Sequence, residues 1–98
     1  MNEKQKDEYI KAIDARIKEL NAELDRLEAR ANRLKAESKI EMMNKIKQMK
    51  EQKKRISSRL IQIKEKGEEA WEDLKKGLSD SVDELSSALK SAASRFKK

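Results

Sequence analysis

Residues 10–34 read IKAIDARIKELNAELDRLEARANRL, and the spacing of their apolar side chains decides the fold. These side chains recur in alternating steps of three and four, the heptad spacing that keeps them on one face of a helix. The positions between them hold charged or other helix-compatible residues, and none breaks a helix. The residues of this predicted seam are Ile10, Ile13, Ile17, Leu20, Leu24, Leu27, Ala31 and Leu34.

The apolar stripe continues toward the C-terminus after a register offset of one residue. Leu24, Met42 and Leu60 are each 18 residues apart, which is five turns of an ideal helix. The stripe therefore keeps an average period near 3.6, which favours helices straighter than those of a steady left-handed supercoil. Lys53 interrupts the stripe, and we interpret it as a side chain that extends to solvent. The seam residues predicted here for self-association are Ile46, Met49, Ile56, Leu60 and Ile63.

Helix-ending signals gather at one place in the chain. Lys64, Lys66 and Gly67 fit a helix C-terminus, and four acidic residues follow within the next six positions. We therefore expect one helix from about residue 3 to 66 and a second after Gly67. Weaker signals lie at Ser38, which begins a capping-box pattern, and at Gly77.

The sequence thus predicts an all-α chain that forms one structural unit. Residues 1–66 form a long coiled-coil helix and residues 67–98 a shorter amphipathic helix. A single helix of this length cannot bury its own stripe, so we expect the second helix to fold back as a hairpin, or the chain to self-associate, or both. The alternative is a three-helix bundle with a further break near Ser38.

Composition excludes most catalytic chemistry. The 98 residues include no Cys, no His and no Pro, only two Gly, and 45% are charged. Thiolate and imidazole ligands for metals are absent, as are Gly-rich phosphate-binding loops. We therefore predict no catalytic, cofactor-binding or metal-binding residues, and we expect a protein that is not an enzyme.

The first functional hypothesis is a structural or interaction module that self-associates through the apolar stripe. Its expected partner is a second copy of the chain or another helical protein. The second hypothesis is reversible binding to a membrane surface through residues 70–96, because six Ser between residues 77 and 96 lie opposite a bulky apolar face. That face, which is also a candidate helix-packing face, consists of Trp71, Leu74, Leu78, Val82, Leu85, Leu89 and Phe96.

The third hypothesis is nonspecific binding of a polyanion by residues 37–66. This segment has ten basic and four acidic side chains, which accounts for the whole net charge of +6. No aromatic residue lies between Tyr9 and Trp71 to stack on bases, so nucleic acid is disfavoured as a partner.

Residues 70–96, AWEDLKKGLSDSVDELSSALKSAASRF, follow a charged segment, LNAELDRLEARANRLKAESKIE, at residues 20–41. Together they resemble a family of small, uncharacterised bacterial coiled-coil proteins whose amphipathic helices are compared with those of apolipoproteins. The resemblance implies an all-α fold and a bacterial origin, and it brings no catalytic residue. The N-terminus has no apolar signal core and no stretch has 18 apolar residues, so we expect a soluble, cytoplasmic protein.

Overall fold

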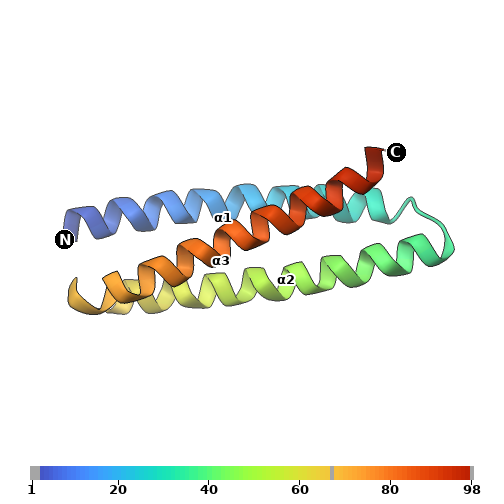
Figure 1. The fold of residues 1–98 in the computed structure, drawn as a ribbon. Coiled ribbons are helices and arrows are strands. Elements are labelled where there is room, and N and C mark those ends of the chain that lie inside the picture. The colour runs from blue at the N-terminus through green and yellow to red at the C-terminus, as the bar shows by residue number, and fades with distance from the viewer. Residues whose placement is uncertain (1–2, 67, 98) are drawn as a thin grey trace.

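The computed structural model describes residues 3–66 and 68–97, which form three helices and a short terminal turn (Figure 1). Helix α1 spans Glu3–Ala31, α2 spans Ala36–Glu65 and α3 spans Glu68–Ser94, followed by the 3₁₀ turn η1 at Arg95–Lys97. The all-α prediction is confirmed. Each helix packs against the other two, so the three helices form one bundle of about 51 × 17 × 15 Å.

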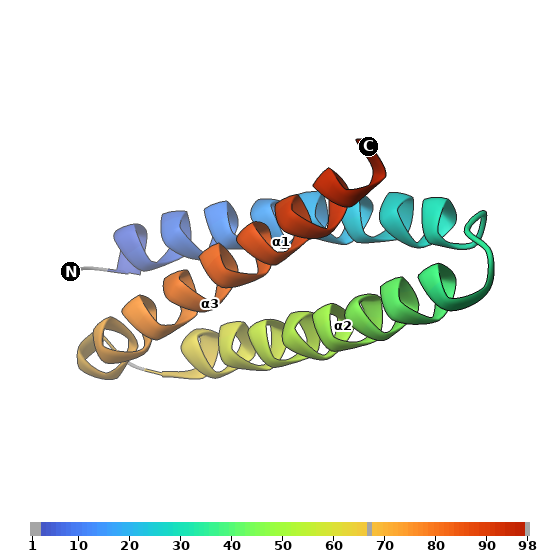
Figure 2. The ribbon, with the colours of Figure 1, turned by 45° about the vertical axis from the view of Figure 1, so that its right-hand side comes forward.

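The helices run alternately up and down the long axis of the bundle. The start of α1 and the α2–α3 connection lie at one end, and the α1–α2 turn and the C-terminal segment lie at the other (Figure 1). Helix α3 starts beside the end of α2 and leans toward the C-terminal half of α1 (Figure 2). The two ends of the bundle are therefore built from different parts of the sequence.

The predicted continuous helix from residue 3 to 66 is wrong. Helix α1 ends at Ala31, and residues 32–35 form a turn that reverses the chain before α2 begins. In this turn the backbone N–H of Arg33 donates to Arg30 O at 3.1 Å and that of Leu34 to Ala31 O at 3.0 Å. The reversal lets α2 cover the stripe of α1 within the same chain, which a continuous helix would leave exposed.

The three-helix alternative has the right number of helices but misplaces the break by a few residues. Helix α2 starts at Ala36, and its N-cap residue Lys35 makes no side-chain capping bond. The Ser38 capping box therefore lies inside the helix. The break near Gly67 is confirmed by the end of α2 and the start of α3, although Gly67 itself lies outside the described residues. Gly77 lies within α3 and does not interrupt it.

The core runs the length of the bundle between the helices. Most of its members are the predicted stripe residues. Each large side chain that is fully buried contributes about 1.5–3 kcal/mol to the stability of the fold. The buried apolar residues are Ile13, Leu20, Leu24, Leu27, Ala31, Met42, Ile46, Met49, Ile56, Leu60, Ile63, Trp71, Leu78, Val82, Leu85, Leu89 and Ala92.

Candidate functional site

The residues predicted for self-association lie in the internal core of one chain. Twelve residues, the two sets named above without Ala31, were predicted for this role. Nine of them are buried, and Ile10, Ile17 and Leu34 are half-buried against the same core. The predicted lipid face of α3 lies there too: Leu74 and Phe96 are half-buried, and the other five members are buried. Both faces are thus occupied by helix packing in the folded chain, and neither forms an exposed surface.

The folded chain instead separates charge between its two ends. Lys53 on α2 donates to Asn21 Oδ1 on α1 at 2.7 Å, and Arg16 on α1 donates to Ser86 Oγ on α3 at 3.1 Å. Residues 23–52 and 86–97 lie at this level or beyond it, toward the α1–α2 turn, and we call them the basic end. They carry eleven basic and six acidic residues, a net charge of +5. Residues 3–22 and 53–85 carry thirteen of each, a net charge of zero.

This separation differs from the charge distribution along the sequence. The basic excess of residues 37–66 is spread over the whole of α2, and several of its cations contact other helices: Lys50 binds Glu28, Lys53 binds Asn21, and Arg59 binds Ser81. The acidic first half of α3 lies beside the second half of α2, and this offsets the positive charge there. Only the basic end keeps an excess.

An exposed apolar side chain stands near the tip of the basic end. Ile40, in the first turns of α2, is 65% exposed. Arg33 and Lys35 in the adjoining turn are exposed, and Lys39 is partly exposed. Two acidic residues of the same stretch offset part of this charge, so residues 32–41 carry a net charge of +1 together with the exposed Ile40. The only other exposed large apolar residue among those described is Ile61, 54% exposed, in the second half of α2.

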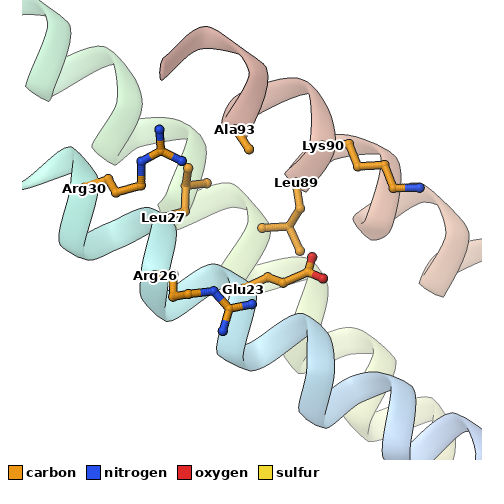
Figure 3. Close-up of a pocket in the computed structure, with 7 residues that line it drawn as sticks. All are labelled: Glu23, Arg26, Leu27, Arg30, Leu89, Lys90 and Ala93. Carbon is orange, nitrogen blue, oxygen red and sulfur yellow. The ribbon is translucent and has the colours of Figure 1, made fainter. Parts of the chain in front are cut away.

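A groove of about 320 Å³ opens between α1 and α3 at the basic end (Figure 3). Leu27 and Leu89 form its apolar floor together with Ala93, and Leu89 points from α3 toward α1. Its rim is made of polar and charged side chains, namely Glu23, Arg26, Arg30 and Lys90. The groove therefore joins an apolar floor to a rim with three basic side chains and one acidic side chain.

A second groove, of about 300 Å³, lies on the other side of α3, facing α2. Its α3 wall is made of Ala88, Ser91 and Ala92, and Arg95 stands at its rim. Both grooves have one physical cause: the last turns of α3 carry Ala and Ser where its first turns carry Trp and Leu. Small side chains leave space beside the helix, and both grooves lie along this Ala- and Ser-rich part of α3.

Two Arg side chains hold the C-terminal segment against the bundle. The guanidinium of Arg30 lies 4.5 Å from the centre of the Phe96 ring, and Arg95 Nη1 donates to Glu41 Oε1 at 2.6 Å. The hydrogen bond and charge of Arg95, together with the charge of Lys45, hold the pKa of Glu41 below its ordinary value. These contacts keep the segment at the basic end.

The neutral end holds polar contacts that the sequence analysis missed. Lys6 is buried, and its ammonium group donates to the carbonyl oxygens of Lys66 and Lys64 at the end of α2. A cation suits this place because the last carbonyls of a helix carry partial negative charge. The Tyr9 ring packs 5.6 Å from the Trp71 ring, centre to centre. The sequence gives one signal for this contact: Lys6 lies four positions before Ile10, which places it on the same helix face as the seam.

The described residues contain no cluster of three or more acidic, His or Cys side chains placed to hold a metal ion. Across the same residues, no helix has the length and apolar character needed to cross a membrane. Comparison with protein-family models, curated protein sequences and solved structures gives no match for this chain. A functional proposal therefore depends on the residues and their arrangement alone.

Proposed function

We propose that this protein is a non-catalytic helical interaction module that docks reversibly, through its basic end, on an anionic lipid surface. The observation that carries the proposal is the exposed Ile40 in the same stretch as Arg33, Lys35 and Lys39, at the end that carries the net charge of +5. Cations attract phosphate headgroups, and an apolar side chain gains free energy by entering the interfacial layer.

The expected affinity is modest. Each Lys or Arg near an anionic membrane contributes about 1 kcal/mol, and a buried aliphatic side chain adds about 2 kcal/mol. Four such groups at the tip give a reversible attachment, weaker than that of a lipid anchor. Unlike binding through the apolar face of residues 70–96, this mode does not require α3 to leave the core.

The positions of the aromatic side chains disfavour nucleic acid as the partner. Tyr9 and Trp71 lie at the neutral end and contact each other. Phe96 is half-buried, with Arg30 stacked over its ring. Among the described residues, the basic end therefore offers no exposed ring on which bases could stack, so DNA or RNA binding would depend on phosphate contacts alone.

Vesicle sedimentation tests the proposal. The protein should sediment with vesicles that contain about one third anionic phospholipid, and it should not sediment with neutral vesicles. Binding should weaken as salt rises, because counterions screen charges at the surface. Equal binding to both kinds of vesicle, or to neither, contradicts the proposal. Tighter binding to double-stranded DNA than to anionic vesicles would favour the polyanion hypothesis instead.

The two exposed Ile residues of α2 provide a matched pair of variants. Ile40→Ser should reduce binding to anionic vesicles by about 30-fold, the equivalent of the about 2 kcal/mol of one aliphatic side chain leaving the interface. Ile61→Ser removes the same side chain from the same helix outside the basic end, so it should leave binding unchanged. If the two variants lose affinity equally, the tip is not the docking surface.

A further inference from the structure

The turn between α1 and α2 lacks the residues that usually stabilise a chain reversal. Residues 31–38, Ala-Asn-Arg-Leu-Lys-Ala-Glu-Ser, contain neither Gly nor Pro. Helix α2 begins without a side-chain cap at Lys35. Ala36 has a φ of 50°, a left-handed backbone conformation that residues other than Gly rarely adopt. The closed turn is therefore strained, although its sequence is compatible with a helix.

The buried faces of α1 and α2 would align if this turn became helical. Leu24 on α1 and Met42 and Leu60 on α2 are all buried, and successive members are 18 residues apart. Eighteen residues make five full turns, so a continuous helix would place all three on one line. Straightening the turn would thus create one long helix with a single apolar face.

We propose that two copies of the chain exchange α1 through this turn. Residues 32–35 become helical, residues 3–65 form one helix, and α1 of each copy packs on α2 and α3 of the other. Every core contact of the closed chain is kept, because each α1 meets the same residues in the partner copy. The left-handed conformation at Ala36 is released, which favours the exchanged form. Dimerisation costs translational and rotational entropy, which favours the closed monomer. The protein concentration therefore decides which of the two forms is populated.

Exchange brings together two like-charged surfaces. A helix of residues 3–65 is about 95 Å long at 1.5 Å per residue, so the two bundles lie end to end. The α1–α2 turn belongs to the basic end, so the two basic ends, each with a net charge of +5, meet at the centre. Their repulsion falls as salt shortens the screening distance from about 30 Å at 0.01 M to about 10 Å at 0.1 M. Salt should therefore promote exchange.

The test is to refold the protein from denaturant over a range of concentrations, because exchange requires α1 to leave its own bundle. Light scattering then gives the mass, and small-angle X-ray scattering gives the longest dimension. We expect a monomer of 11.4 kDa at low concentration and a dimer at high concentration that is about twice as long as the 51 Å bundle. The dimer fraction should rise with salt. A monomer at every concentration, or a dimer no longer than one bundle, overturns the proposal.

Three variants test whether the turn is the hinge. Ala36→Gly removes the strain of the closed turn and weakens the helix of the exchanged form, so the dimer should dissociate about a thousand-fold more readily. Asn32→Ala favours the helix and should tighten the dimer about tenfold. Ala22→Gly, on the exposed face of α1, destabilises the closed and the exchanged form equally and should leave the monomer–dimer equilibrium unchanged. Equal effects of Ala36→Gly and Ala22→Gly overturn the hinge. Vesicle binding by the monomer is measured separately, so either proposal can fail alone.

Discussion

At the residue scale, Lys6 shows how a charged side chain becomes part of a helical core. It is 5% exposed, yet its charge is satisfied by carbonyl oxygens at the end of α2. Lys53 is a milder case, because it lies at the edge of the stripe and donates to Asn21 instead of extending freely to solvent. In both cases a neighbouring helix supplies acceptors that the local sequence does not show.

Lys6→Met should lower the free energy of unfolding by about 1–2 kcal/mol. The variant keeps an apolar stem of similar length but loses the charged hydrogen bonds to the last turn of α2 and the favourable interaction with its C-terminus. Urea denaturation followed by circular dichroism measures the loss. Lys11→Met, at an exposed position of the same helix, is the control and should stay within about 0.5 kcal/mol of the parent. Equal losses would show that the capping contact contributes nothing.

Tyr9 should make stability fall at high pH. Its hydroxyl donates to Lys75 O at 3.0 Å and therefore accepts from Ser79 Oγ at 2.7 Å, since a phenol has one proton. Burial raises the pKa of Tyr9 above 10.0, and the charge of Asp83 adds to this, while the Ser79 hydrogen bond opposes it. The folded chain thus holds its proton more tightly, so this contribution is complete below pH 10 and is lost as pH rises through the folded pKa.

The comparison with Tyr9→Phe isolates that effect from the titration of the many Lys side chains. Between pH 9 and 11.5 the free energy of unfolding should fall more steeply for the parent than for Tyr9→Phe. Denaturant titrations at several pH values measure both slopes. Parallel curves would mean that Tyr9 does not contribute to the pH dependence.

At the element scale, the residues that α3 turns toward its neighbours change along its length. Trp71 and Leu78 in its first half are fully buried, whereas Ala88 and Ala92 in its second half line an open groove on the side of α2. Gly77 lies in the first half, where nothing within 4 Å would obstruct a Cβ atom. Its presence is therefore not required by the packing.

Gly77→Ala should raise the free energy of unfolding by about 0.5–1 kcal/mol, because Ala loses less conformational freedom on entering a helix. Urea denaturation checks the gain. The reverse change, Ala22→Gly, at an exposed position of α1, should lower stability by a similar amount. A loss of stability in Gly77→Ala would indicate a contact at this position that the structure does not contain.

The heptad spacing was sufficient to predict the all-α character and most of the core, since Leu20, Leu24 and Leu60 are buried as expected. It did not predict what covers the stripe, because a second copy and a second helix of the same chain satisfy the same apolar face. The turn at residues 32–35 was missed since it contains no Gly or Pro, and the positive φ of Ala36 is not expected of an Ala residue. The basic end was also missed, because it joins segments far apart in sequence.

At the scale of the whole molecule, the arrangement of charge is the main feature that folding creates. Replacing Arg33, Lys35 and Lys39 together by Gln should weaken binding to anionic vesicles by about 100-fold or more, because each cation contributes about 1 kcal/mol. Exchanging Lys4, Lys11 and Lys18 for Gln removes the same charge from the neutral end and should have little effect. Sedimentation at fixed salt measures both. A loss that depends only on the number of charges removed would contradict an end-on mode of docking.

The length of the bundle sets how far the start of α1 lies from a membrane on which the protein is docked. Its long axis measures 51 Å, and the start of α1 lies at the end opposite the α1–α2 turn (Figure 1). A molecule that stands on a membrane by its basic end would hold the start of α1 about one bundle length above the headgroups. The protein would then act as a pillar, and a fluorophore placed near Glu3 should show far less energy transfer to acceptor lipids than one placed near Lys39.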